Sequence, residues 1–321
     1  MNTERQQHYL TRTLTTALFA GWAAFAVAQP PNMDEINARP DNVGTGAYPA
    51  MKEEDSSLAA HVIFRPANLA AMGDQKLGVV AWGNGGCSPD GASSRFHLLE
   101  LASHGYLVIA SGKILSGPGA PPREPPVEGQ QGAQQGPRTT AADLTSAIDW
   151  ALAENTRAGS PYFGRIDPAQ VAASGFSCGG LQALGVAGDP RIATLVLQNT
   201  GILNAGPNVA LPGMDLVKDQ LAKIHTPTIY ILGGESDIAY VNGMDDFQRI
   251  ENVPIAVANL LGAGHGGTYS QENGGVAAQV AVSWLNWQLR DDAQAGKMFV
   301  GADCGLCSDA KWAYESKRLA P

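Results

Sequence analysis

The segment that most constrains the fold of this chain is Gly175-Phe176-Ser177-Cys178-Gly179. An apolar run at 171–173 precedes it, and residues 181–184, which suit a helix, follow it. The chain is therefore expected to pass from a strand through a very tight turn into a helix. Glycine on both sides suits such a turn, because a larger side chain there would collide with the neighbouring strand or helix. The pattern predicts a serine hydroxyl lifted out of a sheet. A glycine-rich turn that contains serine by chance is the alternative.

Strands and helices alternate on both sides of this turn. Short, continuously apolar runs bounded by Gly or Pro predict buried strands, and apolar residues at helical spacing predict helices. The expected strands are 60–66, 77–82, 106–110, 192–197, 228–232 and 255–261, and the expected helices are 94–104, 139–156, 214–224, 245–251 and 276–289. Residues 29–45, rich in Pro, Asn and Gly, predict an irregular leader. The alternation predicts an α/β fold, with a mostly parallel central sheet and helices on both faces, in one domain over 29–321.

Functional groups gather where the carboxyl ends of parallel strands meet. Two segments at such ends can bind a developing oxyanion: the glycine-rich segment 82–86 and the turn at 177–178. Trp82-Gly83-Asn84-Gly85-Gly86 follows the strand 77–82, and its bare backbone N–H groups can face such an oxyanion. Gly83 and Gly85 would also let a substrate approach the backbone closely. The N–H of Cys178, directly after Ser177, would supply the second donor.

Two further strand ends supply an acid and a histidine. The segment 233–237 carries Asp237, and the loop 262–267 carries His265 between glycines, where it can shuttle a proton between Ser177 and a leaving group. The other five histidines lie in the leader, in a strand, on a helix or at the opposite end of the sheet: His8, His61, His97, His104 and His225. Asp237 is the preferred acid. Alternatives that remain open are Glu235, Asp245 and Asp246.

The order Ser177, Asp237, His265 is that of α/β-hydrolases, and the chain resembles one group of them. Three stretches, Trp82-Gly83-Asn84, Gly233–Ala239 and Gly262–His265, are similar to motifs of extracellular cutinase-like and dienelactone-hydrolase-like enzymes, which include polyester hydrolases. The resemblance implies the α/β-hydrolase fold. It further implies that the N–H groups of Asn84 and Cys178 form the oxyanion hole, and that Trp82 and Ile238 lie near the substrate cleft. Asn84 stands where an aromatic residue is common in that group, and Cys178 where Met is usual.

The expected activity is that of a serine hydrolase of carboxylic esters, which works through an acyl-enzyme intermediate. His265 would act as the base for Ser177, and Asp237 would orient His265. No metal or organic cofactor is needed, and the expected partner is an ester substrate, either a small molecule or a polymer. Hydrolysis of an amide or a lactone is one alternative, and a non-catalytic secreted binding protein is another. A cysteine nucleophile is disfavoured, because Cys178 follows the elbow position. The Pro/Gly/Gln-rich segment 116–137 predicts a surface loop, with a lid over the cleft as the alternative.

The first 28 residues have the pattern of a signal peptide. Arg5 and Arg12 give a positive start, residues 14–27 are mostly apolar, and Ala26-Val27-Ala28 is a small-x-small cleavage site. The apolar stretch is short for a membrane span, so we expect cleavage, a secreted or periplasmic protein and no membrane insertion afterwards. An uncleaved amino-terminal anchor is the alternative. The net charge of −9 argues against nucleic acid or an anionic membrane as a partner, and no motif implies a protein partner.

Export would place the four cysteines in an oxidising compartment, where an even set favours disulfides. Cys304-Gly305-Leu306-Cys307 has no second Cys-x-x-Cys and no nearby histidine, so we expect a local disulfide instead of a zinc site. Cys87 and Cys178 flank the two proposed halves of the oxyanion hole, which must face each other. We therefore expect these two to be bonded. Two buried free thiols are the alternative.

Overall fold

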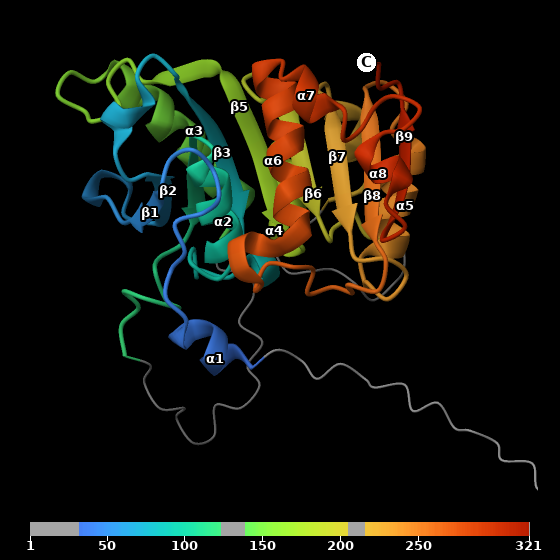
Figure 1. The fold of residues 1–321 in the computed structure, drawn as a ribbon, viewed down its shortest axis with the longest axis horizontal. Coiled ribbons are helices and arrows are strands. Elements are labelled where there is room, and N and C mark those ends of the chain that lie inside the picture. Colours follow the sequence, from blue (N-terminus) through green and yellow to red (C-terminus); the bar gives the residue numbers. More distant parts are fainter. Residues whose placement is uncertain (1–31, 123–138, 205–215, 321) are drawn as a thin grey trace, which may run out of the picture. The chain divides into compact units, whose positions relative to one another are not determined.

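The computed structural model describes residues 32–122, 139–204 and 216–320, and within them it contains a nine-stranded sheet (Figure 1). The strand order is β1-β2-β4-β3-β5-β6-β7-β8-β9. The strands are β1 Ala50–Glu53, β2 His61–Pro66, β3 Leu77–Gly83, β4 Tyr106–Ser111, β5 Ile166–Phe176, β6 Thr194–Gln198, β7 Thr228–Leu232, β8 Ile255–Leu260 and β9 Trp312–Lys317. All neighbours from β4 to β8 in this order are parallel. The pairs β1–β2, β2–β4 and β8–β9 are antiparallel. The predicted α/β class with a mostly parallel sheet is confirmed.

Helices cover both faces of the sheet. They are α1 Met33–Ala38, α2 Arg95–Ser103, α3 Ala141–Thr156, α4 Cys178–Gly185, α5 Tyr240–Arg249, α6 Gly275–Arg290, α7 Ala293–Gly296 and α8 Gly305–Ser308. Alternate residues of β3 enter two separate cores, as the two-residue period of a strand requires. Val79 and Ala81 pack with α3, α4 and α5, whereas Val80 and Trp82 pack with α2 and α6. Figure 1 shows α6 lying across the middle of the sheet. The described residues from Met33 onward form one compact unit.

The main strands and helices lie where the sequence predicts them, and four segments differ. Residues 29–45 are not wholly irregular, because α1 occupies Met33–Ala38. The expected helix 214–224 is a 3₁₀ segment, Lys218–Lys223, and residues 214 and 215 lie outside the described residues. The expected helix 245–251 begins earlier, as α5, and ends at Arg249. The carboxyl-terminal edge strand β9 carries no clear apolar alternation and was not predicted.

Two of the predicted segments fall wholly or largely outside the described residues. These are the signal peptide, 1–28, and most of the loop 116–137, of which residues 116–122 are described. Within the described part of the chain, no helix is long and apolar enough to span a membrane.

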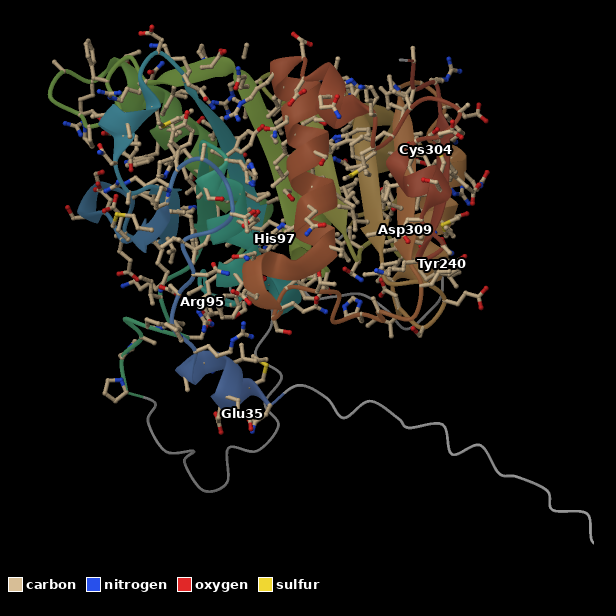
Figure 2. All side chains as sticks on the ribbon, viewed as in Figure 1. Glu35, Arg95, His97, Tyr240, Cys304 and Asp309 are labelled. Carbon is tan, nitrogen blue, oxygen red and sulfur yellow. A yellow bond between two sulfur atoms is a disulfide. The ribbon has the colours of Figure 1, made fainter. Side chains whose placement is uncertain are left out.

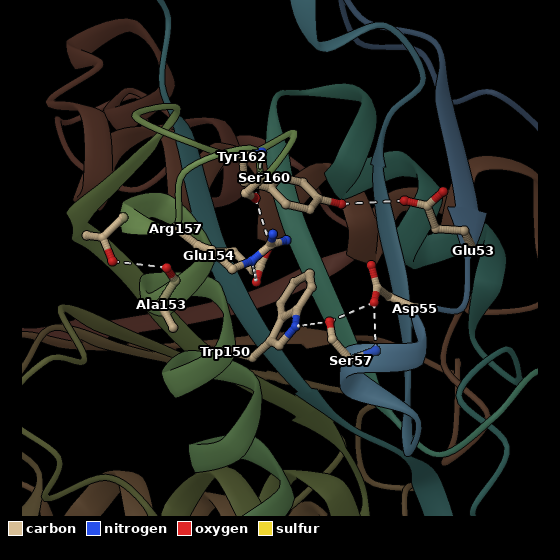
Figure 3. Close-up of polar contacts among 10 residues, drawn as sticks. Glu53, Asp55, Ser57, Trp150, Ala153, Glu154, Arg157, Ser160 and Tyr162 are labelled. Atoms are coloured by element: carbon tan, nitrogen blue, oxygen red, sulfur yellow. Dashed lines mark hydrogen bonds and ion pairs between the residues drawn. The ribbon is translucent and has the colours of Figure 1, made fainter.

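A polar network joins the segment after β1 to α3 (Figure 3). The indole Nε1–H of Trp150 in α3 donates a hydrogen bond to Ser57 Oγ at 2.9 Å. The Ser57 hydroxyl in turn donates to Asp55 Oδ1 at 2.7 Å. Trp150 also packs edge-on against Tyr162, with ring centroids 5.6 Å apart. These contacts tie the segment after the edge strand β1 to α3, which packs on β3, β4 and β5. The network contains no histidine, and its polar groups satisfy one another.

Candidate active site

The turn between β5 and α4 places Ser177 in a backbone conformation that serine rarely adopts. Its φ is 54° and its ψ is −119°. Such a residue persists only where the surrounding structure holds it, and positions of this kind cluster at functional sites. The Ser177 N–H donates to the carbonyl of Gln198 at 2.9 Å, and the Ser177 carbonyl accepts from the hydroxyl of Thr200 at 2.8 Å. The end of β6 therefore fixes the strained turn from both sides.

The two glycines of the motif are required by close packing. A Cβ on Gly175 would lie 2.3 Å from the carbonyl oxygen of Gly179, and a Cβ on Gly179 would lie 1.9 Å from the carbonyl oxygen of Gly83. Neither position can hold a side chain without moving backbone. The predicted reason for glycine on both sides of Ser177 is confirmed, and the second glycine brings α4 against the end of β3.

Ser177, His265 and Asp237 converge as predicted. The Nε2 atom of His265 lies 2.9 Å from Ser177 Oγ, and its Nδ1 atom lies 2.6 Å from Asp237 Oδ1. An ionised carboxylate only accepts hydrogen bonds, so Nδ1 carries the proton toward Asp237 and Nε2 is left to accept the serine proton. Ser177 follows β5, Asp237 follows β7 and His265 follows β8, so three strand ends supply the three groups.

The structure distinguishes Asp237 from the alternative acids. Asp237 is 2% exposed, while Glu235 points to solvent. Asp245 pairs with Lys218 and Arg249, and Asp246 is buried against Lys218. Neither of those two carboxylates bonds to His265.

Hydrogen bonds keep Asp237 in its charged form. Burial alone would raise the pKa of this carboxyl. Donors from His265, the backbone N–H groups of Ala239 and Gly233, and the side chain of Asn199 outweigh that effect and hold its pKa below the ordinary value. Asp237 is thus an ion at neutral pH, and its Oδ1 is aimed at His265.

Cys87 and Cys178 form a disulfide, with Cα atoms 5.2 Å apart, and the expected pairing is confirmed. Cys178 is the first residue of α4, where a backbone N–H has no partner within the helix. Asn84 precedes the short turn Gly85–Cys87, and its backbone nitrogen lies against Gly179. Its buried side chain donates to the carbonyls of Ser88 and Ser111, at 2.9 and 2.6 Å. The Cys87–Cys178 disulfide thus joins the two segments that carry the expected oxyanion donors.

The other disulfide, between Cys304 and Cys307, is also present, with Cα atoms 5.0 Å apart. It spans α8, beside the edge strand β9, and neither cysteine lines the cavity at Ser177. Figure 2 shows Cys304 above Tyr240, which begins α5. The prediction that this bond is local and separate from the site agrees with its position.

A cavity of about 210 Å³ opens beside Ser177 and His265. Of the four residues expected near the substrate, Ile238 lines it and is 78% exposed. The expectation is wrong for Trp82, which is fully buried and packs on the rings of His97 and Tyr269 because its strand position faces α2 and α6. Gly83 is also buried, against Gly179, and Gly85 lies against the ring of Phe176. Neither glycine lines the cavity.

Most of the cavity wall was missed by the sequence reasoning. The missed residues come from α4, from the segment after β6 and from the start of α5: Leu181, Asn199, Thr200, Gly201, Leu203, Ala239 and Asn242. The rule that functional groups gather at strand ends also applies to β6. Applied to the sequence after 192–197, it points to the polar stretch 198–200. No similar signal marks Leu181 or Asn242, whose positions depend on how the helices pack.

No protein-family model matches the chain, and no curated protein matches it in sequence. Among the described residues, no three His, Cys, Asp or Glu side chains are grouped so that they could hold a metal ion.

Proposed function

We propose that this protein is a serine hydrolase of carboxylic esters with the α/β-hydrolase fold. The observation that carries the proposal is the pair of hydrogen bonds at His265, 2.9 Å to Ser177 Oγ and 2.6 Å to Asp237 Oδ1, on a strained strand-to-helix turn. The placement of these groups after β5, β7 and β8 supports the fold assignment. A histidine that is bonded to both a serine hydroxyl and a carboxylate can take the serine proton as the hydroxyl attacks an acyl group.

In this mechanism His265 takes the proton of Ser177 as the hydroxyl oxygen attacks the ester carbonyl. Asp237 holds the His265 tautomer and stabilises the imidazolium that forms. The backbone N–H of Cys178, which lines the cavity, then binds the tetrahedral oxyanion, at about 3 to 4 kcal/mol for such a donor. Asn84, the second expected donor, is fully buried and does not line the cavity, so its N–H would reach the oxyanion only after a local shift of the turn 84–87. His265 returns the proton to the leaving alcohol as the ester C–O bond breaks. His265 then takes a proton from water, whose oxygen attacks the acyl carbonyl, and gives that proton to Ser177 Oγ as the acid leaves.

The cavity supports a small, uncharged group on the substrate. Its volume of about 210 Å³ suits a compact group next to the ester carbonyl. Leu181, Leu203 and Ile238 give it an apolar wall. His265 is the single titratable side chain among the described residues that line it. We therefore propose short to medium acyl chains, with no charge near the carbonyl.

Export is part of the same proposal. Both disulfides are formed among the described residues, and structural disulfides persist in oxidising compartments. Together with the signal-like leader, they support a secreted or periplasmic location. Mass spectrometry of the amino-terminal peptide of the exported protein would test this, with Gln29, or its cyclised form, expected as the first residue.

The decisive experiment is a panel of p-nitrophenyl esters, acetate, butyrate, octanoate and palmitate, with Ser177→Ala as the control. Turnover should favour butyrate over palmitate and should vanish in the control. A fluorophosphonate should label the protein at Ser177, as located by peptide mass spectrometry. Absence of both turnover and labelling would reject a hydrolase and favour a binding protein. Faster cleavage of p-nitroanilides than of esters would move the proposal to amides.

A further inference from the structure

Asn199 lies between the nucleophile and the acid. It follows β6 directly, and β6 is the strand between β5, which carries Ser177, and β7, which carries Asp237. Its side chain is buried, at 2% exposure, and its φ of 45° is in the left-handed region. Asparagine is one of the few residues that tolerate this conformation. The backbone N–H of Asn199 donates to the carbonyl of Ile231 in β7 at 2.8 Å.

The side-chain amide of Asn199 has three partners, and all of them belong to the site or hold it. Its Nδ2 donates to Asp237 Oδ2 at 2.7 Å and to the carbonyl of Gly264, next to His265, at 3.2 Å. Its Oδ1 accepts from the hydroxyl of Tyr269 at 2.6 Å. The carboxylate and the carbonyl only accept, so the NH₂ group must face them, and the amide orientation is fixed.

We propose that Asn199 is a positioning residue that fixes the Asp237 carboxylate and the His265 loop relative to each other, and that Tyr269 fixes the Asn199 amide. This inference rests on the hydrolase function proposed above. The amide of Asn199 contacts Asp237 directly and also the carbonyl of Gly264, next to His265. The N–H groups of Gly233 and Ala239 bind Asp237 alone, and the carbonyl of Gly233 accepts from the N–H of Gly264 in the histidine loop. Among these residues Asn199 alone holds both places with its side chain. Without Asn199, the loop that carries His265 would keep the bond from His265 Nδ1 to Asp237 and the backbone bond from Gly264 to Gly233, and would lose the bond that holds the Gly264 carbonyl.

The surroundings of Tyr269 keep its hydroxyl neutral and in place. Its ring packs against Phe176, with centroids 4.5 Å apart, and edge-on against His97 at 5.6 Å. Figure 2 shows His97 on α2, beside the amino-terminal end of α6, and its side chain is fully buried. Burial, with a further contribution from the Asp237 charge, raises the pKa of Tyr269 well above its ordinary value. Burial lowers the pKa of His97 to about 3, so this imidazole is also uncharged at neutral pH. Tyr269 and His97 therefore add no charge beside Asp237, whose carboxylate is the charged partner of His265.

The test uses Asn199→Gly, because glycine accepts the left-handed backbone and removes only the side chain. We expect kcat on p-nitrophenyl butyrate to fall by about 30-fold with KM changed less than about threefold, since a misplaced catalytic group costs up to roughly 10²-fold. The rate of fluorophosphonate labelling at Ser177 should fall by a similar factor, which measures serine activation without substrate turnover. Asn252→Ala is the matched control. It removes another asparagine donor to a backbone carbonyl, that of Ile224 at 2.6 Å, before β8 at the opposite edge of the sheet.

Tyr269→Phe removes the hydroxyl and keeps the ring. We expect kcat to fall by about fivefold in this variant. Because Tyr269 acts through Asn199, the double variant Asn199→Gly/Tyr269→Phe should be no slower than Asn199→Gly alone. Two independent structural defects would multiply instead, giving a loss of about 150-fold, and that result would overturn the proposed link.

Asn199→Asp supplies a readout that general destabilisation would not change. A carboxylate here would face Asp237, and two carboxylates that share a site bind one proton strongly. With that proton present, the new acid can still donate to Asp237; without it, the two charges repel. The kcat of Asn199→Asp relative to Asn199→Gly should therefore fall as pH rises from about 6 to about 9. A ratio that does not depend on pH would contradict the hydrogen bond to Asp237.

The two proposals fail in different ways. If the natural protein neither turns over esters nor reacts with the fluorophosphonate, the hydrolase function is wrong, and the role of Asn199 with it. If the natural protein is active and Asn199→Gly keeps its kcat, the positioning role alone is wrong. A rise in KM at unchanged kcat would likewise overturn it, because Asn199 would then be a wall of the cavity and no more.

Discussion

Replacing Cys87 and Cys178 together with alanine should reduce both stability and catalysis. The bond joins residues 91 positions apart, so its loss frees a long loop in the unfolded chain. It also ties the turn after Asn84 to the first residue of α4, whose N–H is an expected oxyanion donor. Alanine on both sides leaves no free thiol that could react or form a wrong pairing.

The size of each effect follows from this geometry. For a loop of this length the chain-entropy model gives about 4.6 kcal/mol at 25 °C. At the unfolding entropy usual for a domain of this size, that corresponds to a fall in Tm of roughly 7 °C. Full loss of one oxyanion donor costs about 10²- to 10³-fold in kcat. The loop keeps other anchors, including the Asn84 side chain on Ser111, so we expect a smaller loss, of about tenfold.

The assay pairs thermal unfolding with kcat on p-nitrophenyl butyrate. The matched control is Cys304→Ala/Cys307→Ala, which removes a disulfide that spans only three residues and lies outside the cavity. This control should keep kcat within about twofold and should lose only about 1.6 kcal/mol in the same model. Equal kcat in the two double variants would show that the Cys87–Cys178 bond does not hold the oxyanion donors. A Tm unchanged by removal of that bond would refute the entropic argument.

Four further predictions follow from single positions. Asp237→Asn should lower kcat by about 10⁴-fold with the fold retained, as seen by circular dichroism, because an amide favours the wrong His265 tautomer. Gly179→Ala should cost more than about 4 kcal/mol in urea unfolding, since its Cβ would lie 1.9 Å from the carbonyl oxygen of Gly83. Ile238→Ala should raise KM for octanoate more than for acetate at unchanged Tm, because Ile238 is an exposed part of the cavity wall. Below about pH 4 the free energy of unfolding should fall, because the lowered pKa of Asp237 means that the unfolded chain binds protons first as pH drops; urea titrations should show a shallower fall in Asp237→Asn.

The sequence predicts the parts of this molecule whose signal is local. The continuous apolar runs mark the buried parallel strands because those strands contact helices on both faces. The glycines around Ser177 mark the elbow because backbone atoms occupy the space where a side chain would be. Asp237 and His265 are found because each directly follows a predicted strand, and the edge of a parallel sheet brings such ends together.

The parts that sequence reasoning misses depend on packing between distant segments. Trp82 belongs to the motif Trp82-Gly83-Asn84, yet strand alternation turns its side chain into the core against His97. The edge strand β9 pairs with β8 through backbone hydrogen bonds, and its burial pattern is mostly exposed, so no apolar period marks it. Leu181 and Asn242 reach the cavity only because α4 and α5 pack with their amino-terminal turns toward it.

The order of the strands explains why a residue after β6 has to serve this site. Ser177 and Asp237 follow β5 and β7, which are not neighbours, so these two strands lie about 9 to 10 Å apart, twice the spacing of adjacent strands. His265 bridges Ser177 and Asp237 with its two ring nitrogens. The end of β6 lies between the ends of β5 and β7, next to these two residues. The residue there faces the second oxygen of the acid, and an apolar side chain would leave Asp237 Oδ2 with the Gly233 N–H as its one remaining donor among the described residues. A small amide at this position can serve the acid and the histidine loop together, and Asn199 does both.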